Sequence, residues 1–187
     1  NVSSAIYHAG LTNKERETAQ NEFVYDKVRV VIATNAFGMG IDKSNVRYVI
    51  HYNMPGDLES YYQEAGRAGR DGLESECILL FSERDKGLHE YFITVSQADE
   101  DYKDKMGEKL TKMIQYTKTK KCLEATVVHY FEPNEKLEEC GQCSSCIQQN
   151  KTYDMTQEAK MIISCIARMR QKEIYSIIIQ VLRGETS

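Results

Sequence analysis

Three short β-branched runs constrain the fold of this chain more than any other feature. They are almost continuously apolar and occupy residues 28–33, 46–52 and 76–81. Such runs are typical of strands that are covered on both faces of a parallel sheet. Segments of helical pattern precede the first run and separate the last two, and parallel strands need crossover connections of this kind. We therefore expect an α/β layered domain, with its first strand missing and lying upstream of these three.

Capping signals mark two of the connecting helices. Thr12 opens a segment rich in Lys, Glu and Arg over residues 12–23, and Glu15 stands three positions later. This pair has the pattern of a capping box, in which each side chain accepts from the other residue's backbone N–H. Further along, Asp57 follows a Pro-Gly break and can cap a helix over residues 58–70.

The pattern changes after residue 97, where strand signals cease and the character becomes helical. Apolar residues recur at helical spacing over residues 102–119 and 123–131, which predicts a helical hairpin. A further amphipathic segment covers residues 156–182. We therefore expect three parts: an α/β lobe over 1–97, a helical subdomain over 98–151 and a separate C-terminal segment over 152–187.

Four cysteines have the spacing of a metal site. Cys140, Cys143 and Cys146 follow one another with two residues between them, and Cys122 precedes them. Thiolates so spaced can surround a tetrahedral Zn²⁺ at about 2.3 Å, which leaves no position for a catalytic water and makes the metal structural. Disulfides are the weaker alternative in a reducing compartment. His129 could replace one ligand, although a place on a helix face is favoured.

An Arg-x-x-Arg pair stands near the end of the helix expected after Asp57. Arg67 and Arg70 would share one face of that helix, and Gly66 and Gly69 would let a phosphate or a backbone approach. Two planar, permanently charged guanidinium groups suit a polyphosphate. For the pair taken alone, a solvated basic helix end is the alternative.

The residues around this pair extend it into the motifs of a known family. Residues 63–72 resemble motif VI of superfamily 2 helicases in its RecQ form, and residues 32–43 resemble motif V. Residues 8–11 resemble the region around motif IV, and the one-plus-three cysteine pattern resembles the RecQ zinc region. Residues 154–187 resemble the opening of a winged-helix domain. The chain thus resembles part of a RecQ-family ATP-dependent DNA helicase.

This resemblance implies a RecA-like second motor lobe, a zinc subdomain and a truncated winged helix. The activity would be 3′ to 5′ DNA unwinding in recombination and repair. Arg70 would be the arginine finger that reaches the γ-phosphate, Arg67 would couple hydrolysis to movement and Gln63 would help to close the cleft. The implied nucleotide-binding residues are Gly38, Gly40, Asp42, Arg67 and Arg70, and the implied nucleic-acid contacts are His8, Thr34 and Asn35.

The sequence also limits what the chain is expected to do alone. It has neither a Gly-x-x-x-x-Gly-Lys-Ser/Thr loop nor an acidic box for Mg²⁺, so ATP and Mg²⁺ would bind only with the first lobe. The net charge of −4 argues against coating nucleic acid by bulk charge. Leu123 and Glu124 follow Cys122, where the family usually has a basic residue, so a DNA contact there is in doubt.

The expected partners are the first helicase lobe and DNA, as single strands and duplex junctions, with no membrane partner. The expected location is intracellular, either cytoplasmic at a bacterial nucleoid or nuclear. Two other functions remain open. One is an RNA helicase of the same superfamily, which usually begins motif VI with His-Arg rather than with the Gln63-Glu64 present here. The other is a non-enzymatic zinc-containing nucleic-acid-binding module.

Overall fold

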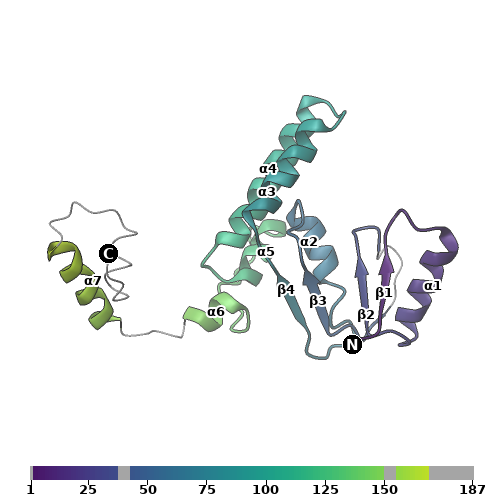
Figure 1. Ribbon diagram of the computed structural model, residues 1–187, viewed down its shortest axis with the longest axis horizontal. Helices are drawn as coiled ribbons and strands as arrows, with labels where there is room; N and C mark the ends of the chain where they lie inside the picture. Colours follow the sequence, from purple (N-terminus) through teal and green to yellow (C-terminus); the bar gives the residue numbers. More distant parts are fainter. Residues whose placement is uncertain (1, 38–42, 150–154, 169–187) are drawn as a thin grey trace, which may run out of the picture.

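The computed structural model describes residues 2–37, 43–149 and 155–168. The N-terminal part contains four short parallel strands in two pairs, with one helix connecting the two strands of each pair (Figure 1). Its elements are, in chain order, β1 (Ser4–Tyr7), α1 (Asn13–Val24), β2 (Val30–Ala33), β3 (Tyr48–His51), α2 (Leu58–Ala65) and β4 (Glu76–Leu79).

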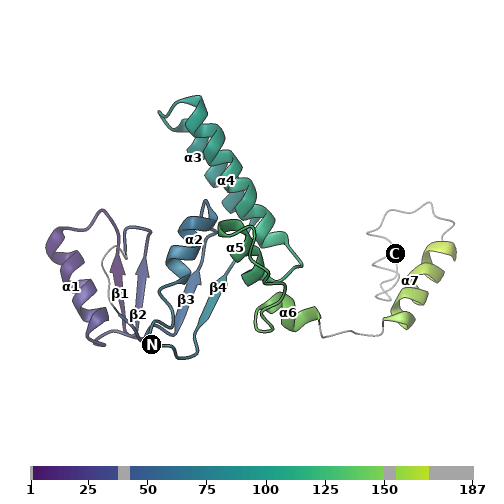
Figure 2. The same cartoon turned by 180° about the vertical axis from the view of Figure 1, so that it is seen from behind.

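The two strand pairs have simple registers. Ser4 lies opposite Val30 in the pair β1–β2, and Tyr48 lies opposite Glu76 in the pair β3–β4. In both Figure 1 and Figure 2, β2 and β3 are the neighbouring inner strands of the two pairs. Within the described ranges they are not hydrogen-bonded to each other, so the sheet is divided between them.

The three apolar runs form strands as predicted, each shorter than its run. β1 was not predicted, because four residues with a single isoleucine do not stand out from their surroundings. The expectation of a further strand stays a prediction. The prediction that both faces of the strands are covered was wrong for the described residues, because Ile32 is 60% exposed and Ile50 is 59% exposed. A divided sheet with one helix per pair leaves this apolar surface bare.

The helical part begins with two long helices that lie side by side. In Figure 1 they project beyond the strands, and their contact is an extended one. The predicted helices 102–119 and 123–131 both form, but the long hairpin joins α3 to α4 rather than α4 to α5. No helix in the described part of the chain is long and apolar enough to cross a membrane. The elements are α3 (Glu83–Val95), α4 (Glu100–Lys118), α5 (Leu123–Phe131), α6 (Ser144–Gln149) and α7 (Thr156–Arg168).

One hydrophobic core joins the α/β part to the helical part. Met54, in the loop before α2, and Leu58, at the start of α2, pack with Leu110 and Met113 of α4. Tyr61 of α2 and Tyr116 of α4 belong to the same core, and their hydroxyl groups lie 3.1 Å apart in a buried hydrogen bond. α2 is thus seated on α4, and its position depends on the helical part as well as on the strands.

A buried carboxylate holds the loop that leads from β3 into α2. Asp85 of α3 is 5% exposed and accepts from Asn53 Nδ2 at 2.9 Å and from the backbone N–H of Met54 at 3.1 Å. Beside it, His89 Nε2 lies 2.7 Å from the carbonyl oxygen of Met54. Burial acts to raise the pKa of Asp85, but these hydrogen bonds outweigh it and lower the pKa below the ordinary 3.8.

Replacing Asp85 with alanine is expected to cost about 1 to 3 kcal/mol of unfolding free energy at pH 7, because the buried Met54 N–H loses its acceptor. The folded-state pKa is lowered, so this contribution is present above pH 3.8 and is lost as the pH falls through the folded-state value. Urea unfolding of both proteins at pH 7 and pH 3 measures it. An equal difference at the two pH values would contradict the ionised, hydrogen-bonded carboxylate.

Candidate motor and metal sites

The four cysteines of the predicted metal site converge. Their Sγ atoms all lie within 4.8 Å of one another. Cys122 stands at the N-cap of α5, and Cys140 and Cys143 flank a turn in which Gly141 has φ +74°. Cys146 lies in α6, directly after that turn. Helix starts and a left-handed glycine turn thus bring three closely spaced cysteines together with Cys122, which stands 18 residues before the first of them.

Backbone N–H groups point at these sulfur atoms. Leu123 N donates to Cys143 Sγ, and Cys140 N donates to Cys122 Sγ, both at 3.3 Å. Burial acts to raise the pKa of Cys143, but backbone donors from Cys146 and Leu123 outweigh it and lower the pKa to about 6. Burial raises the pKa of Cys140 to about 12. Metal binding must displace the protons that these thiols still carry, because the thiolate is the form that binds zinc.

The residues present fit a closed Cys₄ zinc site. All six cysteines of the chain fall in the described ranges and are free thiols, and Cys122 and Cys146 are buried. His129 is not a fifth candidate, because its Nε2 lies 3.0 Å from the carbonyl oxygen of Glu135, outside the cluster. Four sulfur ligands leave no open position, so the ion would stabilise the fold and would not activate water.

The arginine pair does not lie on a helix face as predicted. α2 ends at Ala65, and residues 66–71 form consecutive turns. Gln63 is therefore on α2, whereas half-buried Arg67 and exposed Arg70 follow it. A right-handed helix could not continue to Arg70 in any case, because Gly69 has a φ of +65°.

The two turn glycines make a matched pair for mutation. A Cβ at Gly69 would lie 2.5 Å from Ser75 Oγ and 3.0 Å from the Leu73 carbonyl oxygen, whereas a Cβ at Gly72 (φ +79°) would meet nothing within 4 Å. Gly72→Ala is expected to cost about 1 kcal/mol through backbone strain alone. Gly69→Ala is expected to cost roughly 2 to 3 kcal/mol because a clash adds to the strain. Denaturant unfolding measures both, and equal costs would contradict the crowded turn.

The predicted nucleic-acid residues follow two neighbouring strands. His8 comes directly after β1, and Thr34 and Asn35 come directly after β2, so all three lie at the carboxyl edge of that pair. All are exposed, and Thr34 N donates to the Tyr7 carbonyl at 3.2 Å. Gly38, Gly40 and Asp42 lie outside the described residues.

The structure separates the two predicted sets of residues. α2 leads from the carboxyl edge of β3 back to its amino edge, where Gly69 N donates to the carbonyl of Val46 at 2.9 Å. Arg67 and Arg70 therefore lie near the amino edge of β3, whereas His8 and Thr34 lie at the carboxyl edge of the other strand pair. The predicted residues thus fall into two groups at different strand ends, and not into one cluster.

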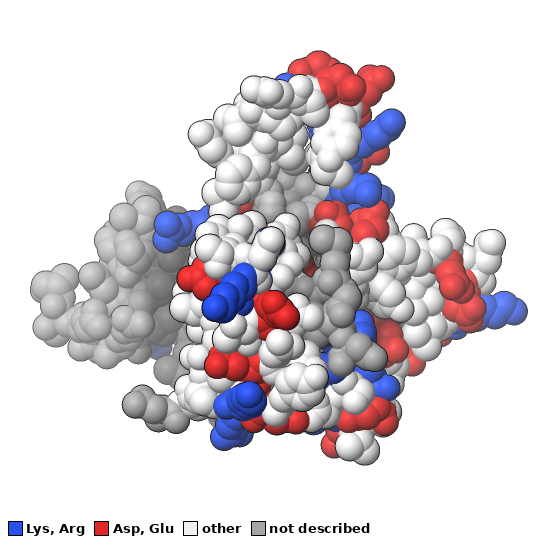
Figure 3. All heavy atoms as spheres, turned by 90° about the vertical axis from the view of Figure 1, so that its right-hand side faces the viewer, with Lys and Arg blue, Asp and Glu red and all other residues white. Residues whose placement is uncertain are grey.

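Charge on the surface is mixed in sign. Figure 3 shows acidic and basic side chains interspersed over the face that α1 presents. This agrees with 24 basic and 28 acidic residues in the whole chain. A contact with nucleic acid would depend on individual side chains at the strand ends and not on a broad basic field.

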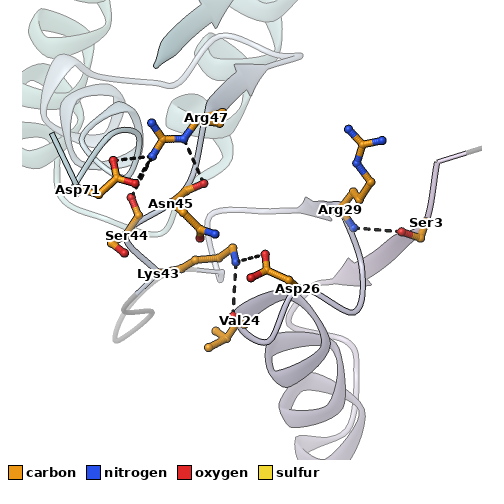
Figure 4. A network of polar contacts seen from close by, with 9 residues as sticks. All are labelled: Ser3, Val24, Asp26, Arg29, Lys43, Ser44, Asn45, Arg47 and Asp71. Carbon is orange, nitrogen blue, oxygen red and sulfur yellow. Dashed lines mark hydrogen bonds and ion pairs between the residues drawn. The ribbon is translucent and has the colours of Figure 1, made fainter. Parts of the chain in front are cut away.

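Sequence reasoning missed the polar contacts that hold these motifs in place. Arg47, before β3, bonds Asp71 in the turn after α2, and Lys43 bonds Asp26 after α1 (Figure 4). Asp85 was missed in the same way. Partners 24 and 17 residues apart have no local spacing rule, so a single sequence holds no signal that would pair them.

Curated relatives resemble the chain along nearly its whole length. "ATP-dependent DNA helicase RecQ" of Bacillus subtilis is 45% identical over 98% of this chain and 31% of its own length. The protein of the same name from Pasteurella multocida is 39% identical over 98% of this chain and 29% of its own length. The mouse "Bifunctional 3'-5' exonuclease/ATP-dependent helicase WRN" is 33% identical over 100% of this chain and 15% of its own length. The chain thus spans less than a third of these relatives.

Family models match consecutive parts of the chain. "Helicase conserved C-terminal domain" matches residues 1–72, "RecQ zinc-binding" matches residues 83–147, and "RQC domain" matches residues 149–187. The chain belongs to the RecQ helicase family. The predicted resemblance, the RecA-like α/β fold class and the structural zinc site on the four cysteines are confirmed for this RecQ-family chain.

Solved structures overlap with this RecQ-family chain in part. The yeast DEAD-box splicing factor Prp28 is 26% identical and has a TM-score of 0.42, over 57% of this chain and 26% of that chain. A DEAD box protein from Methanococcus jannaschii is 28% identical and has a TM-score of 0.42, over 53% of this chain and 27% of that chain.

Proposed function

We propose that this chain is the part of an ATP-dependent 3′ to 5′ DNA helicase that supplies the second motor lobe's arginines and a structural zinc site. One observation carries the proposal: helix α2, which leads into the motif VI arginines, shares a single hydrophobic core with the helices that precede the Cys₄ cluster. A zinc module without a motor role does not require two arginines in a turn that depends on glycines with positive φ. RecQ-family membership agrees with this reading.

Arg70 and Arg67 stabilise charge on a phosphoryl group that another lobe presents. Exposed Arg70 stands in a turn rather than on a flexible tail, so its guanidinium group can be aimed across a cleft with little loss of freedom. ATP with Mg²⁺, held by the first lobe, supplies the phosphoryl group and the metal charge. Gln63, on the last turns of α2, closes the same cleft.

His8, Thr34 and Asn35 contact the DNA backbone at the carboxyl edge of β1 and β2. Nucleotide and DNA thus meet different ends of the strands, as a motor needs if hydrolysis at one place is to move a strand at another. Single strands and duplex junctions are the substrates, recombination and repair the setting, and the location is intracellular, at a bacterial nucleoid or in a nucleus. The proposed division into 1–97, 98–151 and 152–187 assigns these contacts to the first part.

The test uses the full-length protein that contains this chain. ATP hydrolysis is expected to require single-stranded DNA, and a duplex with a 3′ tail is expected to unwind whereas a duplex with a 5′ tail is not. The 187-residue chain alone is expected to show neither activity, because it has no phosphate-binding loop. Unwinding of tailed RNA with equal efficiency would favour an RNA helicase.

A non-enzymatic zinc-containing nucleic-acid-binding module is the second candidate, favoured by the same lack of a phosphate-binding loop in the 187 residues. Full-length protein that binds DNA without any DNA-stimulated hydrolysis would support it and would overturn the helicase.

A further inference from the structure

Arg47, directly before β3, joins two segments that are 24 residues apart. Its Nη2 donates to both carboxylate oxygens of Asp71 at 2.6 Å, and its Nη1 donates to the Glu74 carbonyl at 2.9 Å. Its Nε donates to the Asn45 carbonyl at 3.3 Å, and Nη2 also reaches the Ser44 carbonyl at 3.4 Å (Figure 4). Only a planar fork of donors can make so many contacts from one side chain, so lysine is no substitute.

The carboxylate in this contact belongs to the turn of the proposed arginine finger. Asp71 directly follows Arg70 in the sequence. Gly69 directly precedes Arg70, and its N–H donates to the Val46 carbonyl at 2.9 Å. The hydrogen bond from Arg47 is the main cause that lowers the pKa of Asp71 and keeps it ionised. The turn is therefore tied on both sides of Arg70 to the residues that open β3.

The same short segment is tied on its other side to α1. Lys43 is 8% exposed, and its Nζ lies 2.7 Å from Asp26 Oδ1 and 3.4 Å from the Val24 carbonyl oxygen. Figure 4 shows the two contacts in sequence, from the end of α1 through Lys43 to Arg47 and Asp71. Residues 43–47, which begin at the last residue of the motif V stretch, thus have a polar contact to the helix–strand connection of each strand pair.

We propose that Arg47 is a positioning residue, which through Asp71 sets the place of Arg70 and transmits movement of the motif V segment to it. This rests on the proposed function, since a finger needs a facing phosphate. The physical reason is that a reacting group displaced by about 1 Å can lose on the order of 10²-fold in rate. The Arg70 side chain also donates from its Nε to the Gly66 carbonyl oxygen at 3.4 Å, so a shift of the turn would carry the guanidinium group with it.

The test is made in the full-length protein with saturating single-stranded DNA. Arg47→Met is expected to lower kcat for ATP hydrolysis on the order of 10²-fold, with KM for ATP changed by less than about threefold and with zinc content retained. Arg47→Lys is expected to restore little, because one ammonium cannot replace the fork. Asp71→Asn is expected to behave like Arg47→Met, and it carries the test if that variant does not fold.

A double substitution separates positioning from a general structural role. In an Arg70→Ala background, Arg47→Met is expected to cause no further loss of kcat, because it acts through Arg70. Arg29→Met is the matched control: it also stands directly before a strand, and its guanidinium group points away from these contacts in Figure 4. Its kcat is expected to be unchanged.

Each other result has a defined meaning. If Arg70→Ala abolishes hydrolysis and Arg47→Met does not lower kcat, the positioning role is overturned and the proposed function stands. Losses that add in the double variant, or a loss confined to KM, also overturn the positioning role. If Arg70→Ala leaves kcat unchanged, the arginine finger itself is wrong, and this inference fails with it.

Discussion

Replacing Arg70 with alanine in the full-length protein is expected to lower kcat for DNA-stimulated ATP hydrolysis by about 10³-fold or more, if the proposed function holds. The reason is that an arginine finger acts on charge that develops only as the phosphoryl group transfers, so its loss affects the transition state and not the binding of ATP. KM for ATP and affinity for single-stranded DNA are expected to change little. Steady-state kinetics and fluorescence anisotropy with a labelled oligonucleotide measure these quantities.

Two further variants define the chemistry at this position. Arg70→Lys keeps the charge but loses the planar fork, and it is expected to recover only a small part of the activity. Arg84→Ala removes an exposed arginine from α3 and is expected to leave kcat unchanged. A loss of DNA affinity in Arg70→Ala, with kcat retained at saturating DNA, would show that Arg70 contacts DNA and not the nucleotide.

Replacing Cys143 with serine is expected to reduce bound zinc from one ion per chain to none and to unfold the region around α5 and α6. Binding free energies of structural zinc in small peptides are roughly 10 to 16 kcal/mol, so loss of one ligand can remove several kcal/mol. Cys122, Cys140 and Cys146 would then remain as three thiols without a partner ion, and the first and last of them are buried. Elemental analysis gives the zinc content, and thermal unfolding gives the stability.

Cys77→Ser is the control for this experiment. Cys77 lies in β4, outside the cluster, and its Sγ donates to the Ala65 carbonyl at 3.4 Å, a bond that a serine hydroxyl group can also make. Zinc content and unfolding temperature are expected to stay close to those of the original protein. Folded original protein that contains no zinc after purification without chelators would contradict the Cys₄ assignment.

Local features of this chain could be predicted from its sequence because their causes lie within a few residues. Thr12 and Glu15 form the capping box that their spacing indicated. The β-branched runs form strands because side chains of that shape suit a pleated backbone. The four cysteines converge because Cys-x-x-Cys turns can wrap a tetrahedral ion wherever the chain folds back on itself. Family motifs are likewise contiguous stretches, so they can be read without coordinates.

Other features depended on partners that are distant in the chain. The end of α2 at Ala65 follows from a turn that is hydrogen-bonded to Val46, and not from the helix-forming tendency of residues 66–70. Which apolar faces meet decides that α3 packs along α4 and that Tyr61 contacts Tyr116. Side-chain spacing shows only that such faces exist.

The same distinction applies to the motor site. Arg67 and Arg70 could be singled out from their motif, because guanidinium chemistry and spacing are properties of the sequence. Their separation from Thr34, and the contact between Arg47 and Asp71, could not, because both depend on how parallel strands bring distant segments to the same edge. Residue types and local order thus follow from the sequence, whereas the direction of a side chain and its long-range partners are decided only when the chain packs.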